Sequence, residues 1–356
     1  MDKTDAAYVT LALVPGIGHA RLRSLFSCFE TADEILGARL SQLRAVPGMT
    51  RAAASAVVKA SLTEGERAIA RAEELGGTAL VPTDRLFPSF LREIPDPPTL
   101  LFVAGRPEYL DRPGIAIIGT RDHTSYGAQV CRKLSTGSAR AGLNVVSGMA
   151  RGIDAIAHEG ALDAGGVTVG VLGNGLGVVY PAANRKLYQR VSADGCLVTE
   201  FPPGERPNAG SFPRRNRLIS GLCKVTLVVE GGVKSGALIT ADCALNQGRD
   251  VVAVPGPITS KRSVGCNRLI QMGAKPVLSV ADVLEEFGLE VSPIAPLPNL
   301  PDDERMVFDA LDSGPLHVDD LAKVVQTATA QLLSAVTSLE VRGLITQQPG
   351  KMFVRT

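Results

Sequence analysis

Short apolar segments alternate with amphipathic segments through the middle of the chain. Continuously apolar, β-branched runs lie at 114–119, 143–148, 167–173, 196–200, 225–230 and 250–256. Between them, apolar residues recur with helical spacing near 125–141, 152–164, 182–193, 214–222 and 236–247. Strands that are apolar on both faces and separated by helices predict a parallel sheet with helices on both sides. The predicted fold class is α/β and doubly wound, with ligands bound at the carboxyl ends of the strands.

The first 64 residues have a different pattern. Two turns of the form apolar–Pro–Gly–apolar, at 14–17 and 46–49, each lie between two helix patterns. This is typical of a helix–hairpin–helix, in which glycine permits the turn and backbone N–H groups can meet a phosphate. A small helical bundle with good turn residues explains the same pattern without DNA contact. A helix at 66–75 and strands at 78–82 and 99–104 are then expected as additions to the edge of the sheet.

The last part of the chain predicts a linker and a third module. Residues 290–302 contain four prolines, which indicate a stiff linker. Three helix patterns and a hairpin pattern then predict a winged helix at 303–356. Its presumed recognition helix carries only Glu340 and Arg342 as charges, and the module has a net charge of −2. A helix that reads the major groove is normally basic, so this composition favours protein contact over DNA reading.

Composition limits the class of protein. A length of 356 residues, 45% hydrophobic content and a mean hydropathy of +0.15 indicate an ordered protein of two or three domains. No apolar run is long enough for a membrane span, and the acidic start is unlike a signal peptide, so we expect a cytoplasmic protein. Six separated cysteines without a CxxC pair predict buried, reduced thiols and no metal. Residues 111–288 have a net charge of +6 within a chain of +1, so an anionic partner is expected there.

The loops after the predicted strands are rich in small or cationic residues. They lie at 119–121, 147–152, 173–175, 214–217 and 235–237. Small residues let the backbone approach a ligand, hydroxyls donate to phosphate and arginines neutralise its charge. The segment 212–217, FPRRNR, adds three guanidiniums at the start of a helix pattern. Because these loops converge on one edge of the sheet, they predict a site for a polyanion.

Signals for an enzyme are weaker. The glycines at 173, 175 and 177 lack the GxGxxG spacing of a dinucleotide site, and the sequence has no Walker motif. Asp154, His158, Glu200 and Glu230 lie near the loops. Asp154 and His158 have the spacing of a helical pair, although a carboxylate in the first turn of a helix is already favoured by the dipole. No nucleophile motif occurs, so we expect a binding protein and not an enzyme.

Several ordered motifs resemble one bacterial family. SGMARGID at 147–154, FPRRNR at 212–217, SGALIT at 235–240, VPG at 254–256 and GCNRLI at 265–270 resemble the DprA/Smf (DNA-processing protein A) family. The resemblance covers the sheet domain and, less specifically, both flanking modules. It implies an extended Rossmann-like domain between a helix-hairpin-helix or SAM-like module and a winged helix. The implied ranges are 1–64, 65–289 and 303–356, with the linker at 290–302.

The resemblance also implies a function. A homodimer would bind single-stranded DNA independently of sequence, help displace single-strand-binding protein and load RecA during natural transformation, without cofactor or turnover. The residues implied to bind DNA are Gly119, Thr120, Arg121, Ser147, Gly148, Phe212, Arg214, Arg215, Asn216, Arg217, Ser235 and Gly236. One arginine of the cluster could instead pair with Glu200 or Glu230, and Asn216 could instead cap the helix.

Other interpretations stay open. With only 4% aromatic residues, affinity should come mainly from phosphate contacts, with Phe212 as the candidate for one base stack. A nucleotide hydrolase of the lysine-decarboxylase-like Rossmann group would use Glu230 with an arginine. An adaptor would act through the winged helix alone. Apolar surface around 252–254 and 269–272 could serve for self-association or for the core.

Overall fold

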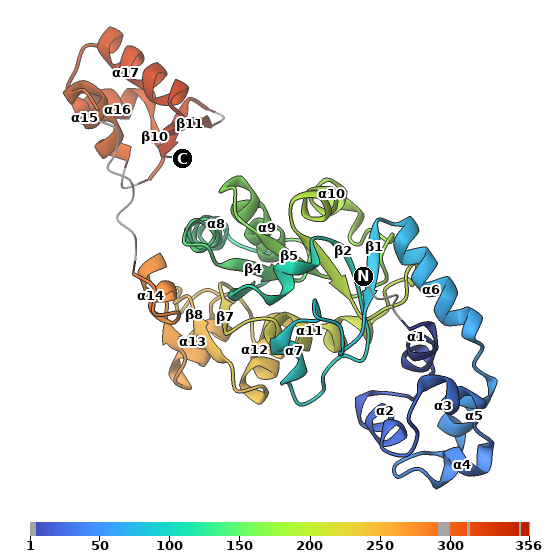
Figure 1. Ribbon diagram of the computed structural model, residues 1–356. Helices are drawn as coiled ribbons and strands as arrows, with labels where there is room; N and C mark the ends of the chain where they lie inside the picture. Colours follow the sequence, from blue (N-terminus) through green and yellow to red (C-terminus); the bar gives the residue numbers. More distant parts are fainter. Residues whose placement is uncertain (1–4, 291–299, 312–313, 349, 356) are drawn as a thin grey trace. The chain divides into compact units, whose positions relative to one another are not determined.

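The computed structural model describes residues 5–290, 300–311, 314–348 and 350–355. Contacts divide the chain into two compact units, Met1–Glu290 and Val291–Thr356, and each is described by itself (Figure 1). The larger unit contains the helical module and the sheet, and the smaller unit contains the winged helix. Most of the linker predicted at 290–302 lies outside the described residues.

One sheet runs through the larger unit, with nine strands among the described residues in the order β1-β2-β6-β5-β4-β3-β7-β8-β9. The strands are β1 (Gly77–Leu80), β2 (Leu101–Gly105), β3 (Gly114–Ile118), β4 (Asn144–Ser147), β5 (Thr168–Val171), β6 (Cys196–Thr199), β7 (Val225–Val228), β8 (Asp250–Ala253) and β9 (Lys275–Pro276). From β6 to β9 all neighbours are parallel, whereas β1 and β2 pair antiparallel at one edge. The mainly parallel sheet and its edge additions are confirmed, and the apolar pattern does not predict β9.

The strand order reverses at β3. This strand pairs with β4 on one side and with β7 on the other, so the chain winds outward from it in both directions. Ile115 and Ile117 of β3 face one core, and Ala116 and Ile118 face the other, which explains the continuously apolar run. Such a reversal opens a crevice at the carboxyl ends of the strands.

Helices cover both faces of the sheet (Figure 1). One face carries α6 (Leu62–Glu74), α8 (Ser125–Arg140), α9 (Ile153–Asp163), α10 (Arg185–Asp194) and α14 (Val280–Glu285). The other carries α7 (Ser89–Arg92), α11 (Ser211–Gly221), α12 (Gly236–Asn246) and α13 (Val264–Gln271). Short 3-10 turns, η1 (Pro107–Asp111) and η2 (Ala182–Asn184), precede β3 and α10. The sequence pattern does not predict α13 or α14 as separate helices.

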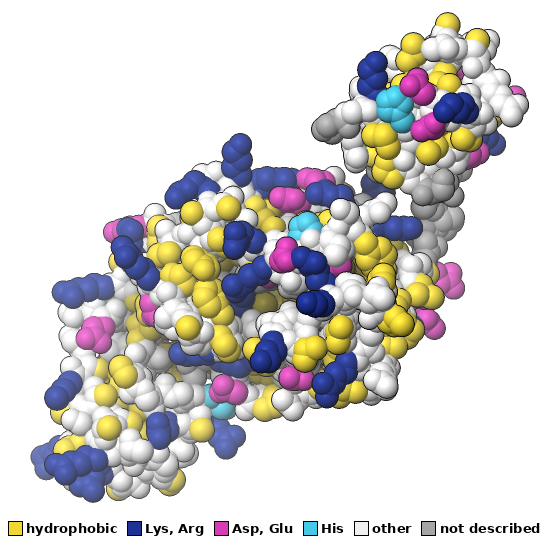
Figure 2. Space-filling model, turned by 180° about the vertical axis from the view of Figure 1, so that it is seen from behind, with side chains coloured by type: hydrophobic (Ala, Val, Ile, Leu, Met, Phe, Trp, Pro, Cys, Tyr) yellow, Lys and Arg dark blue, Asp and Glu magenta, His cyan; other side chains and the backbone are white. Residues whose placement is uncertain are grey.

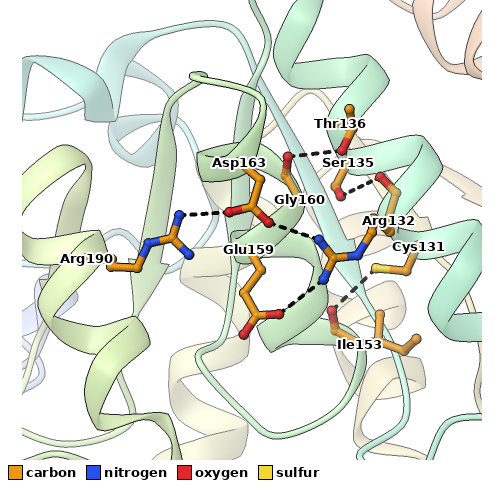
Figure 3. Close-up of polar contacts among 9 residues, drawn as sticks. All are labelled: Cys131, Arg132, Ser135, Thr136, Ile153, Glu159, Gly160, Asp163 and Arg190. Atoms are coloured by element: carbon orange, nitrogen blue, oxygen red, sulfur yellow. Dashed lines mark hydrogen bonds and ion pairs between the residues drawn. The ribbon is translucent and has the colours of Figure 1, made fainter. Parts of the chain in front are cut away.

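Ion pairs join three helices of the first face, as Figure 3 shows. Arg132 on α8 lies 3.3 Å from a Glu159 oxygen and 3.0 Å from an Asp163 oxygen, both on α9. Arg190 on α10 lies 2.8 Å from the other oxygen of Asp163. Partial burial would raise the pKa of Asp163, but the hydrogen bonds from Arg190 and Arg132 outweigh it and lower the pKa. We call these four residues the α8–α10 ion-pair cluster.

The helical module is built from α1 (Ala6–Leu13), α2 (His19–Phe26), α3 (Ala32–Gly37), α4 (Leu40–Ala45) and α5 (Arg51–Lys59). Both predicted turns occur, and Gly16 and Gly48 have positive φ angles of 85° and 77°. Arg21 joins the turns, because its guanidinium donates to the Gly48 carbonyl at 2.9 Å and to the Gly16 carbonyl at 2.6 Å. DNA contact by these turns stays a prediction.

Helix α6 connects the helical module to the sheet. It begins at Leu62, so the boundary predicted between residues 64 and 65 lies inside it. The Gly65 N–H donates to the Thr10 hydroxyl on α1 at 3.1 Å, while Ala72 belongs to the same apolar core as Phe102 of β2. Helix α6 therefore contacts both α1 and the sheet.

The smaller unit has the predicted three helices and hairpin. They are α15 (Asp302–Ala310), α16 (Val318–Val325), α17 (Thr329–Val341), β11 (Ile345–Gln348) and β12 (Met352–Arg355), with β10 (Leu316–His317) paired to β12. The two charges predicted on the recognition helix are engaged within the unit. Arg342 lies 3.2 Å from Glu304, and Glu340 accepts from the Gln347 N–H at 3.1 Å. None of the helices in the described residues has the length and apolar character needed to cross a bilayer.

Candidate functional site

A cavity of about 280 Å³ lies at the carboxyl ends of β3, β4 and β5. It includes four of the predicted site residues, which are Arg121, Gly148, Phe212 and Arg215. The other lining residues are Met149, Ala150, Arg151, Leu172, Gly173, Asn174, Tyr180, Pro181 and Ala183. The structure therefore brings together four of the five predicted segments, the fourth of which, 214–217, lies within α11.

The loop between β4 and α9 forms one wall because its glycines have no side chains. A Cβ on Gly148 would overlap the guanidinium of Arg215 and lie 2.7 Å from an Asp154 oxygen. Gly152 has a φ of 81°, and a Cβ there would lie 2.8 Å from the Cα of Arg121. The Ile153 N–H donates to the Thr120 carbonyl at 3.2 Å. These close approaches hold the loops after β3 and β4 against each other.

Arg215 is buried beneath the cavity, with an exposed fraction of 4%. Its Nη1 donates to the Gly148 carbonyl at 2.6 Å and to the Val171 carbonyl at 2.5 Å. Burial lowers the pKa of Arg215 to about 10, a change that Asp154 opposes and Arg121 reinforces. Burial in turn raises the pKa of Asp154, against the opposing charge of Arg215. At neutral pH Arg215 is therefore a cation that ties β4 to β5.

The possible pairing of Asp154 with His158 is not formed. Asp154 faces Arg215, whereas the His158 Nδ1 lies 2.6 Å from the Thr168 hydroxyl. Burial lowers the pKa of His158 to about 3, so the imidazole is neutral. It belongs to the core beneath β5.

Three arginines at this edge are exposed and keep their charge available. They are Arg121, Arg151 and Arg214. Within the described part of the chain, none of the three has a carboxylate ion-pair partner within 4 Å. Arg121 lies 5.7 Å from the centre of the Phe212 ring, and Arg214 lies 5.4 Å from that of Phe201. Figure 2 shows a face of the larger unit where Lys and Arg side chains border a hollow with exposed hydrophobic groups.

An aromatic pair stands at the cavity. The rings of Tyr180 and Phe212 have centroids 5.5 Å apart with a tilt of 38°. Phe212 is half-buried, and a Cβ on Gly173 would lie 2.8 Å from its ring, so this glycine admits the ring. Tyr180 is 44% exposed. Tyr180 is absent from the set of site residues predicted from the sequence, because a loop position alone does not reveal its neighbours.

The remaining predicted site residues are used differently. Ser147 is fully buried and its hydroxyl donates to the Ile117 carbonyl at 2.6 Å. Arg217 pairs with Glu200 at 2.6 Å and with Asp96 at 3.2 Å, so the expectation that one arginine of the cluster meets Glu200 is confirmed.

The helix boundary explains the position of Asn216. Helix α11 begins at Ser211 and not at Arg214, so Asn216 lies inside it and does not cap it. The Asn216 amide instead donates to the Gly236 carbonyl at 3.5 Å, and Ser235 caps α12 by accepting from the Ala237 N–H at 3.3 Å. Gly119 and Thr120 lie next to Arg121, and the Thr120 N–H donates to the Glu230 carbonyl at 2.8 Å.

The candidate catalytic carboxylates have structural partners. Glu230 is 2% exposed and accepts from the Thr124 N–H at 2.9 Å and from the Thr124 hydroxyl at 2.6 Å, at the start of α8. Burial raises the pKa of Glu200, against the opposing charge of Arg217. The thiols of Cys131, Cys196, Cys223 and Cys266 are buried as predicted, but Cys28 is exposed and Cys243 is only partly buried. That prediction is therefore wrong for two of the six cysteines.

The chain matches the family described as DNA recombination-mediator protein A over residues 78–288 and the DprA winged helix domain over residues 272–351. The chain belongs to the DprA/Smf family. Protein Smf of Synechocystis is 31% identical over 397 residues, with all of both chains covered. DNA processing protein DprA of Streptococcus pneumoniae is 45% identical over 204 residues, which are 57% of this chain and 72% of that protein.

Solved DprA structures agree with the fold. The X-ray structure of DprA from Streptococcus pneumoniae has a TM-score of 0.70 at 34% identity, covering 80% of this chain and 99% of that one. DNA processing protein A from Helicobacter pylori, described for its single-stranded DNA binding mode, has a TM-score of 0.54 at 30% identity. It covers 59% of this chain and 95% of that one. The predicted family and the Rossmann-like and winged-helix parts of the fold are thus confirmed, and the chain belongs to a family of DNA-processing proteins.

Proposed function

We propose that this DprA/Smf family member binds single-stranded DNA independently of sequence at the carboxyl edge of its sheet. The observation that carries the proposal is the cavity with Arg121, Arg151 and the nearby Arg214 exposed and without ion-pair partners among the described residues. Unpaired guanidiniums at loop ends are suited to phosphate oxygens. The Helicobacter pylori relative, described as a single-stranded DNA binder, supports the choice of polyanion.

The geometry favours an unpaired strand over a duplex. A cavity of about 280 Å³ is at the small end of ligand sites, so it suits one nucleotide and not a double helix. Exposed aromatic surface beside the arginines provides a face for an unstacked base. We further propose that the buried members of the predicted set, Ser147, Arg215 and Asn216, position these groups without meeting DNA themselves.

The remaining parts of the proposal concern partners and turnover. We propose a homodimer through the surface of Ile258, Met272 and Leu278, which have exposed fractions of 90%, 70% and 77%. Val252 and Val254, by contrast, are buried in the core. We also propose that the protein loads RecA onto DNA and helps displace single-strand-binding protein. We propose binding without turnover, because the Glu230 carboxylate already accepts two hydrogen bonds from Thr124 at the start of α8.

Titration of a fluorescent oligothymidylate and of the matching duplex at several salt concentrations tests the proposal. We expect tighter binding to the single strand and a log–log salt slope that loses about 0.7 for each phosphate contact removed. Equal affinity for duplex, or a slope near zero, would contradict it. RecA ATPase activity on DNA coated with single-strand-binding protein, with and without this protein, tests the loading step.

A further inference from the structure

Of the two aromatic side chains that line the cavity, Tyr180 is the more exposed, at 44%. Phe212, the base stack predicted from the sequence, is half-buried. The backbone of Gly173 lies under its ring, Arg121 lies 5.7 Å from its centre and Tyr180 adjoins it at 5.5 Å. Phe212 therefore has neighbours on several sides and is less exposed than Tyr180.

Tyr180 is held in place from both sides. The Asn174 amide donates to the Val178 carbonyl at 2.7 Å, two residues before it. The Asn184 amide donates to the Met149 carbonyl at 2.9 Å and to the Ala150 carbonyl at 3.1 Å, which fixes the following segment to the β4–α9 loop. Tyr180 is 44% exposed, and because its segment is fixed at both ends, a ligand that stacks on its ring costs little conformational entropy.

Charged groups lie around this ring. Arg121 and Arg151 line the same cavity as Tyr180 and come from the loops after β3 and β4. Stacking needs only the π face that every base has, whereas the phosphates on either side of a base need cations. Tyr180 and the two arginines together provide both kinds of contact for one nucleotide.

We propose that Tyr180 is the residue on which one unstacked base of the bound strand stacks, and that Phe212 positions Tyr180 and Arg121. This inference rests on the proposed binding of single-stranded DNA at the same site. It assigns the sequence-tolerant part of recognition to a residue outside the set predicted from the sequence. The base contact is then distinct from the phosphate contacts of the arginines.

The test compares Tyr180→Ala, Tyr180→Leu and Tyr180→Phe on two oligonucleotides of equal length, one oligothymidylate and one fully abasic strand with the same phosphates. We expect Tyr180→Ala and Tyr180→Leu to weaken oligothymidylate binding by about 5- to 150-fold, the size of one stacking contact, and Tyr180→Phe to keep it. Binding of the abasic strand and the salt slope should stay unchanged in all three. Tyr126, equally exposed at 44% but outside the cavity lining, serves as the control through Tyr126→Leu.

The outcomes separate this inference from the proposed function. If the unchanged protein does not prefer single-stranded DNA, the proposed function fails. If it does, but Tyr180→Leu binds oligothymidylate as tightly as before, or Tyr126→Leu loses as much affinity, the role of Tyr180 is overturned. Circular dichroism and thermal unfolding confirm that each variant is folded, and Tyr180→Leu keeps apolar contact with Phe212 in case Tyr180→Ala does not.

Discussion

On the outer face of α8, α9 and α10, Arg132 and Arg190 both have carboxylate partners, Glu159 and Asp163. At the carboxyl edge of the same sheet, Arg121, Arg151 and Arg214 have no such partner within 4 Å among the described residues. The residue type is the same and so is its exposure, but only the second group has charge left for an external anion. Arginine content alone therefore does not separate the two regions, whereas the presence or absence of a carboxylate partner does.

The largest expected effect is on stability and concerns Arg215, the buried arginine of segment 212–217. Arg215→Ala should lower the free energy of unfolding by about 3–5 kcal/mol, because the buried Asp154 would lose its compensating charge and the Gly148 and Val171 carbonyls would lose their donor. Arg214→Ala, one residue away and exposed, should change it by less than about 0.5 kcal/mol. Denaturant titration measures both. Equal stabilities would show that Arg215 does not hold β4 and β5 together.

A matched pair of exposed arginines tests the difference directly. Arg121→Ala should reduce the log–log salt slope of oligothymidylate binding by about 0.7, since one phosphate contact is lost. Arg132→Ala should leave the slope unchanged, because that guanidinium is already neutralised by Glu159 and Asp163. Fluorescence anisotropy at four or more salt concentrations gives both slopes. A reduced slope in Arg132→Ala would remove the distinction between the two regions.

The smallest expected effect concerns pH. The pKa of Asp163 is lowered in the folded state, so its pairs add stability above the ordinary carboxyl pKa and lose it as pH falls through the folded-state value. Asp163→Asn should therefore lower stability by at most about 1 kcal/mol at neutral pH, since these side chains are exposed. The difference should vanish in acid. Thermal unfolding at several pH values would detect the trend, and a difference that grows on acidification would have the wrong sign.

Much of the fold could be predicted because apolar periodicity reports burial. Strands with both faces buried, such as β3, give continuous apolar runs, and the loops after them define the edge of the site. The short β9 and α14 were not predicted, because a strand of two residues and a helix of six leave no readable period.

The site could be predicted to the level of its loops but not of its side chains. Arg214 and Arg215 are neighbours in sequence, yet a helix turns them about 100° apart, so one is exposed and the other buried. Which of them is buried depends on where α11 begins, and it begins three residues before the predicted start. Tyr180 was missed because only tertiary contacts bring its loop beside Phe212.

Helix α6 limits where a different amino-terminal module could be joined to the sheet of this protein. Its first turns pack on α1 and its last turns on the sheet, and Gly65 lies so close to Ala6 and Thr10 that a larger residue would overlap them. A gene fusion that grafts a foreign amino-terminal module onto the sheet would therefore have to keep α6, because a junction beyond it would remove Ala68 and Ala72 from the core that contains Phe102. A junction at residue 64 would divide that helix and remove Val9 of α1 from the same core.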